Sequence, residues 1–262
     1  MEKPEVVILC GGQGSRLSEE TVLKPKPMVE IGGRPILWHI MKIYSSFGYN
    51  RFILALGYMG EYIKKYFYDY RILANDFTLA MHPEESPQIH NLHEHSDWEI
   101  TFVDTGLDTL KGGRIKRLEK YIKSDNFHVT YGDGVADIDI EKLYNFHISH
   151  NQIATVTSVR PPSRFGEIIL SGDKVTKFEE KPQLGTGLIN GGFIVLKKEF
   201  LNYLTPDVNC DFEFGALQKL AQDGGLRAYN HTGFWQCMDN VRDRDYLNKL
   251  WGTNQAEWKV WE

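Results

Sequence analysis

The sequence VVILCGGQGSRL, residues 6–17, is the stretch that decides the class of fold. It begins as a run of apolar residues, which is typical of a strand buried on both faces. Three glycines within four positions, residues 11–14, follow the run and allow backbone N–H groups to converge on phosphate oxygens. Arg16 adds a planar, permanently charged group that suits phosphate. The stretch predicts a buried strand and a phosphate-binding loop, although a plain glycine-rich turn fits this loop equally well.

Outward from this stretch, short apolar runs alternate with amphipathic segments. Strands are expected at Val6–Cys10, Arg51–Gly57, Glu99–Asp104, Phe127–Tyr131 and Ile153–Arg160, and helices at Ile36–Phe47, Glu61–Tyr70, Ile115–Ile122 and Ile138–His150. After about residue 160, shorter strands are expected at Ile168–Leu170, Val175–Glu179 and Gly192–Leu196, and helices at Phe212–Gln222 and Arg242–Trp251. The pattern predicts an α/β fold with a Rossmann-like, doubly wound, mostly parallel sheet and a smaller mixed β region.

Ligands of such sheets bind beyond the carboxyl ends of the strands. The loop Gly11–Arg16 and Asp133 both follow predicted strands, so we expect them to face one crevice. Two common nucleotide-binding motifs do not fit the loop. A Walker loop would end in Gly-Lys-Ser/Thr, and a dinucleotide fingerprint would require Gly or Ala in place of Leu17.

The composition excludes several classes of protein. The chain has 262 residues and a net charge of −5, which argues against a nucleic-acid binder. We expect no signal peptide and no membrane span, because no apolar run is long enough. The three cysteines share no metal-type spacing and are interpreted as reduced thiols of a cytoplasmic protein.

The motif KPKPM, residues 24–28, places two lysines on a segment that its prolines keep stiff. A solvated basic turn is one interpretation. A lysine directed at a developing phosphate charge is the other.

Together, GGQGSRL and KPKPM resemble the signature of the sugar-1-phosphate nucleotidylyltransferases. Further matches are YGDG (131–134), EEKP (179–182), NGGF (190–193) and FWQCMD (234–239). The segments SEET (18–21), VDTG (103–106), GGR (112–114), RFG (164–166) and the tail WKVWE (258–262) resemble members that act on CTP and glucose 1-phosphate.

The resemblance implies one nucleotidyltransferase domain over residues 1–262, with a nucleotide-binding half (1–150) and a half for sugar-phosphate binding and oligomerisation (151–262). The implied reaction converts CTP and α-D-glucose 1-phosphate to CDP-glucose and pyrophosphate, with Mg²⁺, in a homo-oligomer. The same chemistry with dTTP or UTP, or with CTP and another phosphorylated acceptor, is the alternative. A catalytically silent subunit on the same fold is a third hypothesis.

The resemblance also implies roles for individual residues. The implied catalytic residues are Arg16, Lys26, Asp133, Lys181 and Asp239, of which Asp133 and Asp239 would bind Mg²⁺. The implied nucleotide-binding residues are Leu9, Gly11, Gly12, Gly14, Ser15, Arg16, Lys26, Arg114 and Gly132. The implied sugar-phosphate-binding residues are Glu180, Lys181, Asn190 and Gly191. Arg114 is a candidate for reading cytosine, and Lys24 is a weaker candidate than Lys26.

Other signals are interpreted structurally. A zinc site at His82, His90, His93 and His95 is set aside for want of a complete ligand set, and Ile72–Ser96 is expected to be a mobile loop over the active site. Asp137 and Asp139 are expected at a helix start. The tryptophans are expected in the core or, in the C-terminal tail, against a partner subunit.

Overall fold

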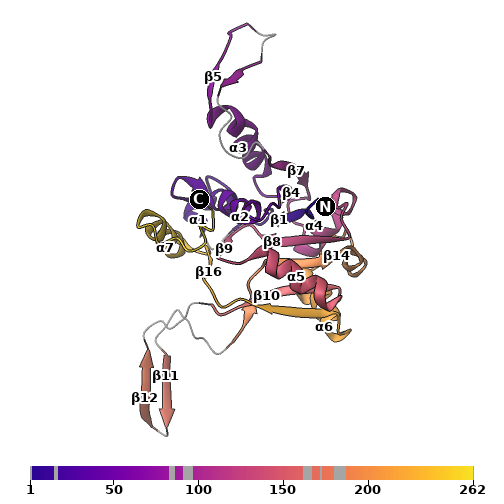
Figure 1. The fold of residues 1–262 in the computed structure, drawn as a ribbon, viewed down its shortest axis with the longest axis vertical. Coiled ribbons are helices and arrows are strands. Elements are labelled where there is room, and N and C mark those ends of the chain that lie inside the picture. Colours follow the sequence, from indigo (N-terminus) through magenta and orange to yellow (C-terminus); the bar gives the residue numbers. More distant parts are fainter. Residues whose placement is uncertain are drawn as a thin grey trace.

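The structure is a computed structural model that describes residues 2–14, 17–82, 86–90, 97–161, 167–171, 173–179 and 187–261. Its centre is an eight-stranded sheet in the order β13-β10-β14-β8-β1-β4-β7, with β15 paired to β10 (Figure 1). The strands are β1 (Val6–Leu9), β4 (Arg51–Leu56), β7 (Glu99–Asp104), β8 (Asn126–Tyr131), β10 (Ala154–Val159), β13 (Ile189–Asn190), β14 (Ile194–Lys197) and β15 (Leu226–Asn230).

The strands of the first half are parallel. Strand β1 pairs with β4 and β8, and β4 pairs with β7. All four residues of β1 are buried, as the apolar run predicts. Val6 and Ile8 pack into one apolar cluster and Val7 and Leu9 into another, because successive side chains point to opposite faces. The two clusters confirm a sheet that is covered on both sides.

The second half extends the same sheet with mixed pairing. Strand β14 is antiparallel to β8 and β10, whereas β10 is parallel to β15. The predicted α/β class and the mostly parallel sheet with a mixed β region are therefore confirmed. Strand β15 was not predicted, because its exposed and half-buried residues lack a clear alternation.

Apart from the short α1, which was not expected, the helices occur where helical segments were predicted, with shifted boundaries. They are α2 (Ile36–Ser45), α3 (Gly60–Leu73), α4 (Lys111–Arg117), α5 (Ile140–His150), α6 (Gln218–Gln222) and α7 (Val241–Gly252), together with the short α1 (Ser18–Thr21). Helix α4 begins before the predicted helix at 115–122, which ends in the 3₁₀ turn η3 (Glu119–Tyr121). The predicted helix at 212–222 begins as a π-helix, η5 (Phe212–Leu217), and continues as α6. The shorter elements are η2 (Lys26–Met28), β2 (Glu30–Ile31), β3 (Arg34–Pro35), β9 (Gly134–Ala136), η4 (Lys198–Tyr203) and β16 (Trp235–Cys237).

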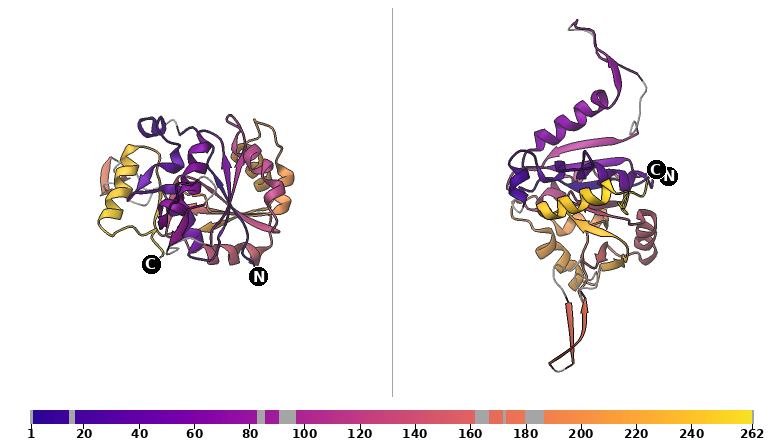
Figure 2. Two further views of the ribbon diagram at one scale, coloured as in Figure 1. Left: turned by 90° about the horizontal axis from the view of Figure 1, so that it is seen from above. Right: turned by 90° about the vertical axis from the view of Figure 1, so that its left-hand side faces the viewer.

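Two hairpins project from the body in opposite directions (Figures 1 and 2). One, beyond α3, pairs β5 (Asp76–Thr78) with β6 (Gln88–His90), and the other pairs β11 (Glu167–Ser171) with β12 (Lys174–Glu179). The expectation of a loop at 72–96 is wrong where the chain forms the end of α3 and the two paired strands, and the described residues 79–82 and 86–87 are irregular. Short polar strands carry too little apolar periodicity to be recognised from sequence. His93 and His95 lie outside the described residues, and no group of potential metal ligands among the described residues contains His82 or His90.

The C-terminal tail packs on its own chain. Trp258 is fully buried, and its Nε1 donates to Nδ1 of His39 in α2 at 3.4 Å. Trp261 meets Trp38 of the same helix edge to face, with 5.8 Å between ring centroids. The core prediction therefore holds for these residues. Within the part of the chain that the structure describes, no helix combines the length and apolarity that a membrane crossing requires.

Candidate active site

A two-stranded ribbon brings Asp133 and Asp239 together. Strands β9 and β16 are antiparallel, with Gly134 opposite Cys237, and the Met238 N–H donates to the Asp133 carbonyl at 2.8 Å. Asp133 thus lies between β8 and β9, and Asp239 lies between β16 and α7. The N–H of Asp239 also donates to the side chain of Asp243 at 3.0 Å, in the first turn of α7. The pairing register, rather than either motif alone, places the two carboxylates at one point.

The ammonium of Lys26 lies between these carboxylates. Its Nζ is 2.7 Å from Asp133 Oδ2 and 2.7 Å from Asp239 Oδ1. Burial alone would lower the pKa of Lys26, but the two carboxylates outweigh it and raise the pKa, so the side chain stays charged. Two carboxylates that already share one cation fit the ligand set that Mg²⁺ prefers.

Cys237 is a third group at this point that the sequence interpretation missed. Its Sγ and one carboxylate oxygen each of Asp133 and Asp239 all lie within 4.8 Å of one another. Burial raises the pKa of the thiol, and the charge of Asp133 raises it further. The sequence signal that could have identified Cys237 is its position two residues before Asp239, in the motif at 234–239.

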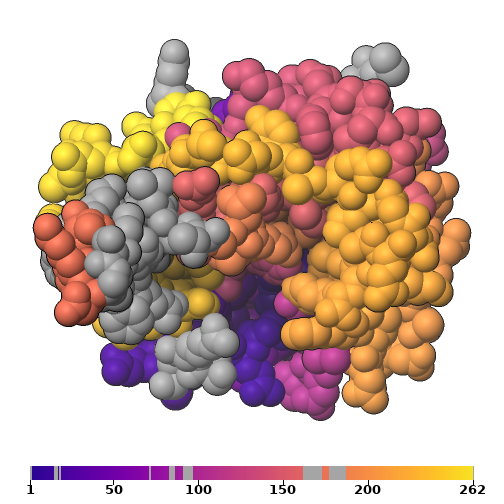
Figure 3. Space-filling view, turned by 90° about the horizontal axis from the view of Figure 1, so that it is seen from below, coloured from indigo at the N-terminus to yellow at the C-terminus, as the bar shows by residue number. Residues whose placement is uncertain are grey.

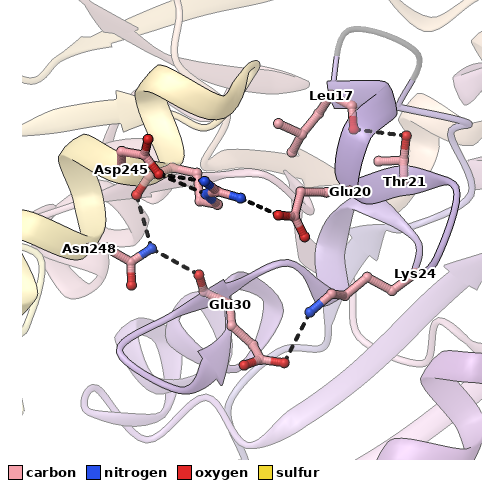
Figure 4. Close-up of polar contacts among 8 residues, drawn as sticks. Leu17, Glu20, Thr21, Lys24, Glu30, Asp245 and Asn248 are labelled. Carbon is pink, nitrogen blue, oxygen red and sulfur yellow. Dashed lines mark hydrogen bonds and ion pairs between the residues drawn. The ribbon is translucent and has the colours of Figure 1, made fainter.

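The structure distinguishes the two lysines of the KPKPM motif. Lys24 pairs with Glu30 at 3.1 Å (Figure 4). Lys26, in the 3₁₀ turn η2, is instead directed toward Asp133 and Asp239. Residues on either side of this turn are held to α7: Glu20 pairs with Arg244, and the Asn248 amide donates to the Glu30 carbonyl at 3.1 Å (Figure 4). These contacts join the segment that carries Lys26 to the helix that follows Asp239.

The glycine loop packs closely against the same segment. Gly14 has a positive φ of 64°, and a Cβ there would lie 2.9 Å from both Lys26 Cβ and Thr21 Cγ2. A Cβ on Gly132 would lie 2.9 Å from the Leu9 carbonyl oxygen. Gly12 has open space where its Cβ would be. Packing therefore requires glycine at Gly14 in the loop and at Gly132 after β8, whereas Gly12 has room for a side chain or a ligand.

Arg114 supports the glycine loop through a hydrogen bond to its backbone. It is 4% exposed, and its Nη2 donates to the carbonyl of Gly11 at 3.0 Å. The remaining acceptors of the two terminal nitrogens are Leu56 O, Thr105 Oγ1, Gly106 O and Leu107 O, at 2.7 to 3.0 Å. Burial lowers the pKa of the guanidinium. The expected contact with cytosine would need these N–H groups, so the geometry favours support of the loop instead.

A cavity of about 260 Å³ opens beside the cluster of Lys26, Asp133 and Asp239. Its lining residues are Lys111, Thr130, Tyr131, Asp133, Gly134, Asn190, Gly191, Trp235, Cys237 and Asp239. Asn190 and Gly191 are thus beside the aspartates, and Trp235 Nε1 donates to the Gly191 carbonyl at 2.8 Å. The space-filling view from below shows a hollow near the middle of that face, between orange segments of the second half and indigo and magenta segments of the first half (Figure 3).

The lining of the cavity adds residues to the predicted set. Lys111, Tyr131 and Trp235 were not singled out, although each lies in or directly before a motif of the resemblance. Four predicted residues, Ser15, Arg16, Glu180 and Lys181, lie outside the described residues. Of the pair expected at a helix start, Asp139 caps α5 by accepting from the Lys142 N–H, whereas Asp137 faces His231 at 2.9 Å.

Comparison with known proteins assigns the chain to a family. The protein-family model described as Nucleotidyl transferase matches residues 5–238. The chain is 48% identical to a glucose-1-phosphate cytidylyltransferase of Salmonella typhi, over 98% of this chain and 100% of that one. It is 45% identical to a probable glucose-1-phosphate cytidylyltransferase of Bacillus subtilis, over 98% of this chain and 100% of that protein.

The fold is similar to that of a solved structure, HddC from Yersinia pseudotuberculosis complexed with GMP-PN. The TM-score is 0.68 at 26% identity, over 95% of this chain and 100% of that one. With a family match over most of its length and near full-length relatives well above 30% identity, the chain belongs to the nucleotidyl transferase family.

Proposed function

We propose that the chain transfers a cytidylyl group from CTP to α-D-glucose 1-phosphate and releases pyrophosphate. The observation that carries this proposal is the Lys26 ammonium shared by Asp133 and Asp239 at the edge of a polar cavity. The 48% identity to a glucose-1-phosphate cytidylyltransferase along nearly the whole chain supports the choice of substrates.

The proposed reaction is a single in-line displacement. A phosphate oxygen of glucose 1-phosphate forms a bond to the α-phosphorus of CTP, and the bond from that phosphorus to the pyrophosphate oxygen breaks. No protein nucleophile is needed. Catalysis then depends on holding two anions in line and on neutralising their repulsion.

The carboxylates of Asp133 and Asp239 would hold Mg²⁺. When bound, the ion would supply positive charge between the two phosphate groups. The ammonium of Lys26 would move from the carboxylates to an α-phosphate oxygen, because the phosphate competes with the carboxylates for it. Cys10 and Cys237 take no part as nucleophiles, because burial raises the pKa of both thiols.

The remaining assignments rest on the family resemblance. Arg16 and the backbone at Gly11, Gly12, Gly14 and Ser15 would hold the triphosphate, with Leu9 and Gly132 at the base of the loop. Lys181 would hold the sugar phosphate, and Glu180, Asn190 and Gly191 would contact sugar hydroxyls. The residues 1–150 would then form the nucleotide-binding half and 151–262 the sugar-binding half.

The test is pyrophosphate release from CTP, UTP, dTTP and ATP with several sugar 1-phosphates, with Mg²⁺ and with a chelator. We expect the highest rate for CTP with glucose 1-phosphate and loss of the rate with chelator. Equal rates with UTP would remove the cytidylyl assignment, and no release from any pair would favour a catalytically silent subunit.

Two expectations about the protein's surroundings remain proposals. The cysteines are free thiols, which suits a reducing compartment such as the cytoplasm. A homo-oligomer is expected from the family resemblance, and light scattering of the purified chain would test it.

A further inference from the structure

A hydrogen-bonded chain of side chains borders the cavity on the side of Asn190. The Asn190 Nδ2 donates to the Tyr131 hydroxyl at 2.8 Å, and that hydroxyl donates to Glu213 Oε1 at 2.8 Å. Lys111 forms an ion pair with the same oxygen of Glu213 and lies over the Tyr131 ring, 5.1 Å from its centroid. The chain joins four elements, because these residues come from β13, β8, η5 and α4.

These contacts fix the orientation of the Asn190 amide. Its Nδ2 donates to Tyr131, and its Oδ1 accepts from the Gly192 N–H at 3.0 Å. If the amide were flipped, its oxygen would face the Tyr131 oxygen, whose proton is donated to Glu213. Its NH₂ group would face the N–H of Gly192, so that two donors would meet. The amide therefore keeps one N–H and one oxygen lone pair, at fixed positions, for another group.

Asn190 is exposed and lines the cavity, so the group that uses these positions comes from the ligand. One donor and one acceptor at fixed points suit hydroxyls of a polyol in one configuration and not in another. Glu213 is not among the lining residues, so it can act on a ligand only through the neighbours that are, Tyr131 and Lys111. Its charge strengthens the hydrogen bond that it accepts from the Tyr131 hydroxyl, and the polarised hydroxyl becomes a better acceptor for Asn190.

We propose that Tyr131 and Glu213 are positioning residues that fix the Asn190 amide and thereby determine which hydroxyl configuration of a hexose 1-phosphate is accepted. This inference rests on the proposed function, because it takes the cavity as the sugar-phosphate site.

The first test is Tyr131→Phe, which removes only the hydroxyl. The KM for glucose 1-phosphate should rise about tenfold, and the preference for glucose 1-phosphate over galactose 1-phosphate should fall by a similar factor. The KM for CTP should stay within about twofold, since the glycine loop is untouched. Tyr203→Phe is the matched control, because the Tyr203 hydroxyl donates to Asp223 at 3.1 Å outside the cavity. It should change none of these values.

A second variant keeps the inference testable if Tyr131→Phe folds poorly. Glu213→Gln retains an acceptor and removes the charge, so it should shift the same two quantities in the same direction by a smaller factor. Adding Asn190→Ala to either variant should cause little further loss of sugar preference, because the groups act as one unit. Fully additive effects would show that Tyr131 does not act through Asn190.

A binding measurement separates this inference from the reaction itself. In calorimetric titrations, the wild-type chain should bind CDP-glucose more tightly than CDP, and Tyr131→Phe should reduce that ratio about tenfold. A variant that keeps the wild-type ratio and KM would overturn the inference while the proposed function stands. A wild-type chain that binds CDP-glucose but releases no pyrophosphate from CTP would overturn the function, and the titration would still decide the role of Tyr131. Binding of neither ligand would overturn both.

Discussion

The proposed nucleotide-binding and sugar-binding residues are held by two sets of hydrogen bonds that differ in depth. On the nucleotide side, defined here as the loop 11–14 with Arg114, a guanidinium that is 4% exposed donates to backbone carbonyls. On the sugar side, defined as Asn190 with Tyr131, Glu213 and Lys111, exposed or half-exposed side chains bind one another. The loop backbone cannot move without breaking several hydrogen bonds to the buried guanidinium. A single side chain on the sugar side can be substituted with the loss of only one or two contacts. The structure therefore combines a rigid nucleotide side with a sugar side that a few substitutions can alter.

The largest expected effect is a loss of kcat on substitution of Asp133 or Asp239, which lie between the nucleotide side and the sugar side. Asp133→Asn or Asp239→Asn should lower kcat by about 10²- to 10³-fold, because each removes a carboxylate charge that would hold Mg²⁺ beside the reacting phosphates. Steady-state rates of pyrophosphate release would measure it. Asp139→Asn is the control, since asparagine also caps a helix and α5 would keep its N-cap. Either cluster variant retaining more than half of the wild-type rate would contradict the proposed metal site.

The rigidity of the nucleotide side can be tested with two neighbouring glycines. A Cβ on Gly11 would lie 2.2 Å from Arg114 Nη1, whereas a Cβ on Gly12 would meet nothing within 4 Å. Gly11→Ala should therefore lower the free energy of unfolding by about 1–3 kcal/mol, and Gly12→Ala should leave it nearly unchanged. Urea denaturation of both variants checks the difference. Equal stabilities would show that Arg114 does not constrain the loop.

The packed layer behind the nucleotide side should respond to acid. Helix α2 packs on the turn that carries Lys26, and burial in this helix lowers the pKa of His39 from 6.5 to about 4. Its Nε2 donates to the Ile31 carbonyl at 2.8 Å, and its Nδ1 accepts from the Trp258 N–H at 3.4 Å, so a second proton on Nδ1 would break that hydrogen bond.

The unfolded chain takes up a proton on this histidine below pH 6.5, but the folded chain does so only near pH 4. The stability contribution is thus complete above pH 6.5 and is lost as the pH falls toward 4. Melting temperatures at several pH values should fall less steeply for His39→Gln than for the wild type. An unchanged slope would contradict the buried neutral form.

The smallest expected effect on stability is on the sugar side. Lys111 has a side-chain exposure of 44%, and an ion pair at such a position contributes about 1 kcal/mol or less. Lys111→Met should therefore leave the free energy of unfolding within about 1 kcal/mol of the wild type while lowering sugar preference. Urea denaturation would measure the stability of the variant, and substrate competition on the same preparation would measure its sugar preference. A loss of stability as large as that of Gly11→Ala would remove the distinction between the two sides.

The fold was largely predictable because its signals are local. The apolar run at β1 identified a central strand directly, and the segment at Glu99–Asp104 identified the edge strand β7. Short, half-exposed strands such as β15 and the β5–β6 hairpin were missed, since their residues show no period that differs from a loop. The boundaries of α4 were wrong because two glycines within it obscured the helical pattern.

The candidate site was only partly predictable. Lys26, Asp133 and Asp239 were identified through motifs, and the structure brings them together. Arg114 was a candidate for reading cytosine because a guanidinium can contact the carbonyl and the ring nitrogen of that base, but the sequence does not say where the guanidinium points. Cys237 and Tyr131 lay inside motifs and were passed over, because their importance comes from partners far away in the chain.

By itself, the sequence determined a buried parallel strand that leads into a glycine loop, and it determined the family, since both depend on the order of neighbouring residues. Only the tertiary structure decided that Lys26 rather than Lys24 faces the aspartates, that Gly134 pairs with Cys237, and that Arg114 supports the loop. Local periodicity fixes which face of an element is buried, but pairing register and side-chain direction depend on contacts between segments that are distant in the chain.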